Sequence, residues 1–234
     1  MAMGVLPLIF GCGGEEGNSP PAARPPAGAS TEAPARAEDA QVILFLGTSL
    51  TAGLGVDPDD AYPALVQARV NSAGLPFRVV NAGSSGETSA GALRRLDWLL
   101  RQPFDVVVVE TGANDMLRGA SPDSTRANLR RIVERLRTER PDARIVLAGM
   151  MALPNLGREY GEAFQAIYPE LAREYRLPLI PFLLDGVGGE AGLNLPDGVH
   201  PNEAGHRRVA QTVWTTLEPV LREEAAGTAT GRDS

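Results

Sequence analysis

Three residues from distant parts of the chain carry the side chains that acyl transfer requires. Ser49 lies in the stretch GTSL, directly after an apolar run, and Asp197 and His200 lie three residues apart in a later loop. Serine becomes a nucleophile when a base removes its proton, histidine is the usual base near neutral pH, and a carboxylate fixes the histidine tautomer. A serine after a strand is by itself more often a helix N-cap. Together the residues predict a triad of Ser49 as nucleophile, His200 as base and Asp197 as orienting acid.

Acyl transfer also needs hydrogen-bond donors for the oxyanion that forms on the substrate. The backbone N–H groups of Ser49 and Gly83 and the side-chain amide of Asn114 follow three apolar runs. We therefore predict an oxyanion hole of Ser49, Gly83 and Asn114, in which Gly83 has no side chain to block the approach. The alternatives are a turn role for Asn114 and a tight turn at Gly83. Asp115 is expected to cap or brace a helix.

These residues must meet at one edge of the fold, and the hydrophobic pattern predicts such an edge. Apolar runs of strand length occur at 42–46, 77–80, 104–109, 145–148 and 177–183. Helical patterns follow Thr88 and Ser121, a third covers residues 164–171, and the last begins at Pro201. Continuous apolar runs are typical of strands buried on both faces, and their alternation with helices predicts a mostly parallel sheet. We expect a flavodoxin-like, three-layer α/β/α fold of five strands, with ligands outside the carboxyl ends of the strands.

The segment after the fourth run predicts where a substrate would bind. Met150, Met151, Leu153 and Pro154 follow that run closely. Methionine side chains adapt to irregular apolar ligands, although they also fill cores. These four residues are predicted to form a substrate-binding groove, with a core position as the equal alternative.

Four sequence blocks, taken in order, resemble those of the SGNH hydrolases, which are also called GDSL esterases. The blocks are GTSL, NAGSSGETSAG, GAND and DGVHP, so the family's Ser, Gly, Asn and His would fall on Ser49, Gly83, Asn114 and His200. The stretches SSGETSAGALRRLDWLL and GMMALPNLGREY are similar to the bacterial branch of multifunctional arylesterases, lysophospholipases and thioesterases. The resemblance covers about residues 41–222. It implies a cofactor-free serine esterase, acting on small acyl esters or thioesters through an acyl-enzyme.

Thr48 departs from the pattern of that family, which usually has Asp before the serine. Threonine can form a hydrogen bond but carries no charge, so the support of the turn around Ser49 is in question. Two other functions stay open. One is a carbohydrate O-deacetylase with the same triad, and the other is a catalytically inactive, tethered binding protein.

The composition excludes several other classes of function. The 234 residues carry a net charge of −7, which disfavours binding to nucleic acid. No lysine is present, which excludes Schiff-base and P-loop chemistry, and the one cysteine, Cys12, cannot form an internal disulfide. We see no cluster of metal ligands. The second histidine, His206, is expected to be solvated on a helix start.

The two ends of the chain have compositions unlike the middle. Residues 1–12 form a short apolar stretch that ends in Gly11 and Cys12, as at a lipoprotein cleavage site, although no Lys or Arg precedes it. Residues 13–40 are rich in Pro and Ala and predict a disordered tether, residues 41–222 the hydrolase domain, and residues 223–234 a polar tail. We expect a periplasmic or cell-envelope protein tethered to the membrane through lipidated Cys12; an inert thiol in a ragged N-terminus is the alternative.

Overall fold

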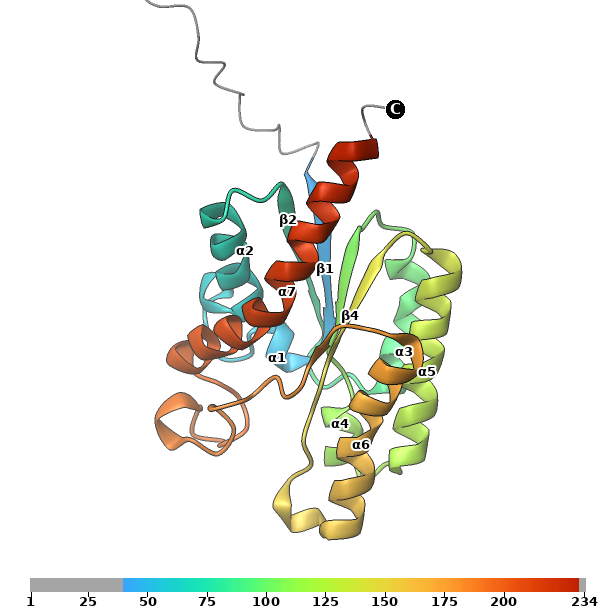
Figure 1. Cartoon of the computed structure of the whole chain (residues 1–234). Helices are drawn as coiled ribbons and strands as arrows, with labels where there is room; N and C mark the ends of the chain where they lie inside the picture. The colour runs from blue at the N-terminus through green and yellow to red at the C-terminus, as the bar shows by residue number, and fades with distance from the viewer. Residues whose placement is uncertain (1–39, 232–234) are drawn as a thin grey trace, which may run out of the picture. The chain divides into compact units, whose positions relative to one another are not determined.

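The structure, a computed structural model, describes residues 40–231 and contains a five-stranded sheet in which every pairing is parallel. The strands are β1 Gln41–Gly47, β2 Phe77–Gly83, β3 Val106–Val109, β4 Arg144–Ala148 and β5 Leu179–Ile180, in the spatial order β2-β1-β3-β4-β5. This is the strand order of flavodoxin-like folds. The predicted fold class is therefore confirmed (Figure 1).

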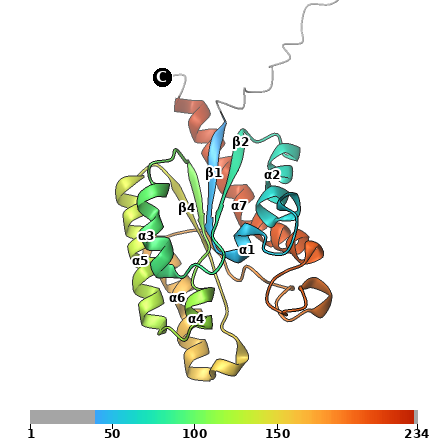
Figure 2. The same cartoon turned by 180° about the vertical axis from the view of Figure 1, so that it is seen from behind.

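Helices cover both faces of the sheet (Figures 1 and 2). On one face α2 (Tyr62–Ser72) packs against α7 (Glu203–Gly231), and on the other α3 (Ser89–Leu99) packs against α5 (Pro122–Glu139), which in turn contacts α6 (Arg158–Tyr175). Two short helices, α1 (Ser49–Ala52) and α4 (Ala113–Leu117), begin just after β1 and β3. The helix starts expected at Thr88 and Ser121 are found, and both side chains accept a hydrogen bond from a backbone N–H of the first turn.

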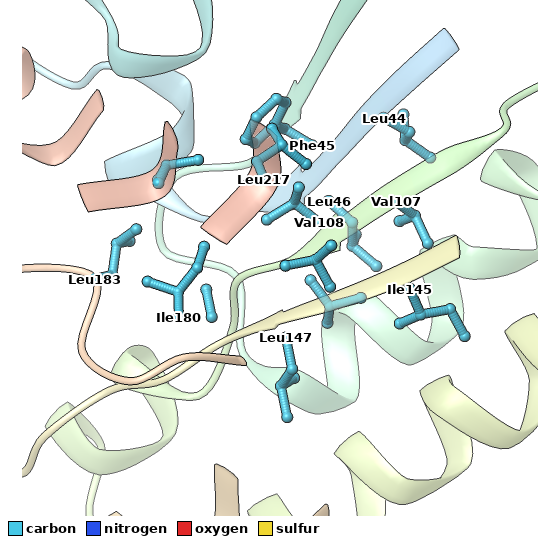
Figure 3. Packing of buried hydrophobic residues seen from close by; sticks show 14 of the residues in the cluster. Leu44, Phe45, Leu46, Val107, Val108, Ile145, Leu147, Ile180, Leu183 and Leu217 are labelled. Atoms are coloured by element: carbon cyan, nitrogen blue, oxygen red, sulfur yellow. The ribbon is translucent and has the colours of Figure 1, made fainter. Parts of the chain in front are cut away.

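The central strands are buried on both faces, as their continuous apolar sequences predict. Val106 to Val109 have no exposed surface, and the β1 residues Val42 to Leu46 are at most 5% exposed. Figure 3 shows part of the cluster that β1, β3 and β4 form with the covering helices. This core fixes the carboxyl ends of the strands, and the predicted site residues follow those ends.

The fifth strand is shorter than its apolar run. Only Leu179 and Ile180 of the run 177–183 pair with β4. Pro178 and Pro181 flank this pair, and proline has no N–H to donate to a neighbouring strand. The run is buried in part without being a strand, because Leu183 packs into the core from the loop that follows.

The predicted polar tail is helical as far as the structure describes it. Helix α7 continues to Gly231, and its end is fixed by a hydrogen bond from Gln41 to Thr228 and an ion pair between Arg144 and Glu223. Glu and Ala, which are the most frequent charged and apolar residues in this part of the segment, are good helix formers, so polarity here does not mean disorder.

The N-terminal predictions cannot be placed on this fold. The segment 1–12 with Cys12, and the tether at 13–40 except for its last residue, lie outside the described residues. Within residues 40–231, no helix combines the length and apolar character needed to cross a bilayer.

Candidate active site

The structure brings Ser49, His200 and Asp197 into one hydrogen-bonded chain. Ser49 is the first residue of α1, and its Oγ lies 2.9 Å from Nε2 of His200. The other ring nitrogen, Nδ1, lies 2.7 Å from Oδ2 of Asp197. A chain in this order lets the imidazole take the proton of the serine while the carboxylate stabilises the imidazolium. The structure therefore brings the three residues of the predicted triad together.

The loop of Asp197 organises the carboxylate with backbone groups. Oδ1 of Asp197 accepts the N–H groups of Val199 at 2.9 Å and His200 at 3.0 Å, which leaves Oδ2 for the imidazole. The hydrogen bond from the His200 N–H, followed by that from Val199, lowers the pKa of Asp197 to about 2. Asp197 thus stays ionised throughout the pH range in which a histidine acts as a base.

Ser49 and Asn114 each carry a hydrogen-bond donor at the site. The N–H of Ser49 opens α1, so it has no acceptor within that helix. Nδ2 of Asn114 donates one hydrogen bond to the Glu87 carbonyl at 3.0 Å, and an amide nitrogen carries a second hydrogen. Both Ser49 and Asn114 line the same cavity.

Gly83 does not reach the site, in contrast to the sequence prediction. Gly83 still belongs to β2, paired with Gly47, and its N–H donates to the Asn81 side chain at 2.9 Å. A Cβ at this position would lie 2.7 Å from the Cα of Ala52, so the glycine allows α1 to pack on the strand. The glycine that lines the cavity with Ser49 and Asn114 is Gly86, three residues later.

Gly86 is held by groups outside the cavity. Its φ of 75° is a conformation that favours glycine, and its carbonyl accepts a hydrogen bond from Arg118 at 2.7 Å. The next residue, Glu87, forms an ion pair with Arg95 at 2.7 Å and offers its carbonyl to Asn114. Within the part of the chain that the structure describes, the N–H of Gly86 has no hydrogen-bond partner.

A cavity of about 540 Å³ opens beside Ser49 and is lined mainly by apolar side chains. All four predicted groove residues line it. Met150 is buried, whereas Met151 and Leu153 are 44% and 38% exposed. Of the five large hydrophobic side chains that are exposed in the described part of the chain, four line this cavity: Leu54, Leu117, Met151 and Leu153. The exposed apolar surface is therefore concentrated around the nucleophile.

A buried carboxylate lies beneath the nucleophile, and the sequence analysis missed it. Glu110 directly follows β3, has no exposed surface, and accepts hydrogen bonds from the backbone and side chain of Thr48 and the side chain of Thr51. Burial raises its pKa to about 7, although these hydrogen bonds act in the opposite direction. In the sequence, Glu110 could have been noticed as an acidic residue that directly follows four consecutive valines.

His206 is buried, so the expectation of a solvated side chain is wrong. It is 1% exposed, lies parallel to the ring of Tyr62 with 6.3 Å between the ring centroids, and accepts the Tyr62 N–H at Nδ1. Burial lowers the pKa of His206 to about 4. His206 joins α7 to α2 and takes no part in the hydrogen bonds that link Ser49, His200 and Asp197. Within residues 40–231, no group of three or more His, Cys, Asp or Glu side chains is arranged to hold a metal ion.

Comparisons with known proteins show which proteins this chain is similar to. A model of the GDSL-like Lipase/Acylhydrolase family matches residues 45–208. The esterase TesA of Pseudomonas aeruginosa is 42% identical over 183 residues, which are 78% of this chain and 90% of that protein. Thioesterase 1/protease 1/lysophospholipase L1 of Escherichia coli is 37% identical over 191 residues, 81% of this chain and 89% of that protein. The crystal structure of TesA superposes on this chain with a TM-score of 0.73 at 42% sequence identity. The match covers 76% of this chain and 99% of the chain in that structure.

Proposed function

We propose a residue-level mechanism for this chain, which belongs to the GDSL-like lipase/acylhydrolase family and hydrolyses ester bonds. Ser49 is the nucleophile, His200 is the general base and acid, and Asp197 orients His200. The observation that supports this assignment is the 2.9 Å separation between Ser49 Oγ and His200 Nε2, with Nδ1 bound to a carboxylate. The substrates are small-molecule carboxylic esters or thioesters, such as aryl esters and lysophospholipids.

Catalysis proceeds in two steps, acylation of Ser49 and hydrolysis of the acyl-enzyme. Ser49 Oγ attacks the carbonyl carbon while His200 Nε2 takes the serine proton, and the carbonyl oxygen becomes an oxyanion. The carbon–oxygen or carbon–sulfur bond then breaks, and His200 returns the proton to the departing alcohol or thiol. Water attacks the acyl-enzyme in the same way, giving its proton to His200. The free acid leaves and Ser49 regains its proton.

The proposed oxyanion hole consists of the N–H groups of Ser49 and Gly86 and the second amide hydrogen of Asn114. All three residues line the cavity at Ser49. The N–H of Gly86 is held in place through the hydrogen bond between Arg118 and the Gly86 carbonyl. Donors fixed before the reaction stabilise a developing charge without reorganisation.

The apolar cavity favours acyl groups longer than acetyl over the carbohydrate O-deacetylase alternative. For Met151→Ser we expect kcat/KM on p-nitrophenyl octanoate to fall about 10-fold, because each buried methylene contributes roughly 0.8 kcal/mol. The same variant should change kcat/KM for p-nitrophenyl acetate by less than about 2-fold, since a short chain buries little surface. Initial rates on the two esters measure the effect.

Trp98→Ser supplies the matched control for this experiment. Trp98 is the remaining large hydrophobic side chain that is exposed in the described residues, and it does not line the catalytic cavity. The Trp98→Ser variant should leave the ratio of kcat/KM on p-nitrophenyl octanoate to kcat/KM on p-nitrophenyl acetate unchanged. An equal loss on both esters in Met151→Ser would show that Met151 does not contact the acyl chain.

A fluorophosphonate probe tests the triad and separates the enzyme from the inactive binding protein considered above. Such probes react only with an activated serine, because the phosphorus is attacked by a serine oxygen whose proton is removed. We expect one adduct, located on Ser49 by mass spectrometry of the digested protein. A folded protein without an adduct, or with an adduct elsewhere, would argue against the mechanism.

We also propose that the protein is periplasmic or bound to the cell envelope through a lipid on Cys12. The support is the apolar stretch 1–12, which ends in a small residue followed by the single cysteine of the chain. Mass spectrometry of membrane-extracted protein is expected to find an acylated Cys12. Cys12→Ser should move the protein to the soluble fraction, and an unmodified Cys12 in membrane extracts would contradict the proposal.

A further inference from the structure

The carboxyl group of Glu110 lies under the turn that carries Ser49 and takes no part in the triad. Oε2 accepts the N–H of Thr48 at 2.7 Å and Oγ1 of Thr51 at 2.8 Å, while Oε1 accepts Oγ1 of Thr48 at 2.9 Å. These contacts hold the residue immediately before Ser49 and the residue two positions after it. The conformation of the nucleophile turn is thus tied to one carboxyl group 61 positions later in the sequence.

The turn is built closely around this carboxyl group. A Cβ on Gly47 would lie 2.7 Å from Glu110 Oε2, so only glycine allows the approach. Thr48, Thr51 and Glu110 are each at most 1% exposed. Water is excluded from the carboxyl group, and its protein donors replace the missing solvation.

The groups around the Glu110 carboxyl group can all donate hydrogen bonds to it, as an ionised carboxylate requires. The Thr48 N–H can only donate. The hydroxyl of Thr51 lies 2.6 Å from that of Tyr62, so Tyr62 can donate to Thr51 while Thr51 donates to Glu110. The Thr48 hydroxyl donates as well. A protonated Glu110 would need one of these hydroxyls to become an acceptor, and the contacts that hold the turn would weaken.

We propose that Glu110, as a carboxylate, is a positioning residue that holds the peptide between Thr48 and Ser49 and so places the Ser49 hydroxyl and N–H for catalysis. The proposal rests on the proposed function, since it concerns the same nucleophile. It implies that loss of the Glu110 charge lowers kcat and leaves KM almost unchanged. It also implies that the enzyme loses activity when Glu110 takes up a proton.

The surroundings of Glu110 place that protonation in an observable range of pH. The titratable groups that face it are Tyr62 from α2 and Tyr168 from α6, and both tyrosine pKa values are raised, first by burial and then by the Glu110 charge. His206 of α7 lies behind Tyr62 and stays neutral, and Asp115 of α4 is a buried acid nearby. A cation also contacts the turn, because Arg95 donates a hydrogen bond to the Gly47 carbonyl at 3.4 Å.

Because burial raises the pKa of Glu110 to about 7, the carboxylate form dominates above that pH and is lost below it. The active form in the proposal is the ionised one, so its contribution to kcat falls as the pH falls through about 7. Glu110→Gln has no such ionisation. The ratio of wild-type kcat to Glu110→Gln kcat should therefore depend on pH, because pH effects that are common to both enzymes cancel in that ratio.

The decisive experiment measures kcat and KM for p-nitrophenyl butyrate in wild type and Glu110→Gln from pH 5 to pH 8.5. At high pH we expect kcat of the variant to be about 30-fold lower, which is typical for the loss of a hydrogen bond to a charged group, with KM within about 2-fold. Toward pH 5 the kcat ratio should approach about 1, since wild-type Glu110 is then protonated as well. A constant ratio across this range, or a variant with wild-type kcat, would overturn the proposal.

Thr111→Val is the matched control for a purely structural effect. Thr111 is the next residue, equally buried, and its Oγ1 has no hydrogen-bond partner in the described residues. This variant should keep kcat within about 2-fold at every pH, because it removes no contact with the turn. A loss as large as that of Glu110→Gln would show that any change at this strand end disturbs the site.

A second pair of variants keeps the proposal testable if Glu110→Gln does not fold. Thr48→Val removes the hydroxyl donor but keeps the N–H, and we expect about a 5-fold loss of kcat. Thr48→Ser should recover most of that loss; equal activity of the two variants would overturn the proposal. Full activity of Ser49→Ala would instead refute the triad, so the two failures are distinguishable.

Discussion

Hydrolysis of p-nitrophenyl butyrate is expected to fall by roughly 10⁴-fold or more in the Ser49→Ala variant. Alanine removes only Oγ, so the N–H of Ser49 and the start of α1 remain, and the oxyanion donors stay in place. Without Oγ no acyl-enzyme can form, and His200 has no proton to take. Ser49 is 8% exposed in a turn with room for alanine, so we expect no loss of folding stability. Steady-state kinetics and a thermal melt test both statements.

Ser72→Ala is a suitable control for this substitution. Ser72 lies on the exposed side of α2, where its hydroxyl donates only to the Ala68 carbonyl. We expect its activity to equal that of wild type and its fluorophosphonate adduct at Ser49 to be retained. Retention of more than about a tenth of wild-type activity in Ser49→Ala would exclude Ser49 as the nucleophile, since a triad without its serine keeps only a small residual rate.

The fold could be predicted because its strongest signals are local. Four consecutive valines, Val106 to Val109, fit only an element that is apolar on both faces, and they form the central strand β3. The parallel order then places the residue after each strand at one edge, which brings Ser49 and Asn114 to the same cavity. The length of β5 was not predictable from hydrophobicity, since Pro178 and Pro181 limit its pairing without changing its apolar character.

The error at Gly83 has a specific physical origin. The stretch NAGSSGE contains two glycines, and hydrophobicity does not show where the strand ends between them. In the structure β2 continues to Gly83, because this residue pairs with Gly47 and allows the α1 backbone to pack closely. Gly86 lies beyond the strand, where the chain turns toward the cavity. Strand register, which depends on contacts distant in sequence, decides between the two glycines.

Glu110 and His206 were missed because hydrophobic periodicity identifies apolar positions and is silent about buried polar groups. Glu110 is buried by contacts with Thr48, 62 residues earlier, and His206 by the backbone of Tyr62, 144 residues earlier. Each contact satisfies a polar atom that burial would otherwise leave without a partner. The question raised by Thr48 in the sequence has a structural answer, since its uncharged side chain donates to a carboxylate that is already present.

Asp197→Asn is expected to lower kcat by about 10³-fold at pH 7, through the tautomer of His200. Oδ1 of the asparagine would still accept the N–H groups of Val199 and His200, so the loop keeps its conformation. The amide nitrogen would then occupy the place of Oδ2 and donate toward Nδ1. An imidazole that accepts at Nδ1 carries its proton on Nε2, and that nitrogen cannot take the proton of Ser49.

Comparison with Asp197→Ala separates this tautomer effect from the loss of charge. The Asp197 side chain is 47% exposed, so solvent screens its charge and water can replace part of its effect on the imidazolium. Water at the vacated position can also accept the Nδ1 proton, whereas asparagine cannot. We therefore expect Asp197→Asn to be at least as inactive as Asp197→Ala. The control is Asp123→Asn on the exposed first turn of α5, and this variant should keep wild-type activity. An asparagine variant clearly more active than the alanine variant would show that Asp197 acts by its charge and not by selecting the tautomer.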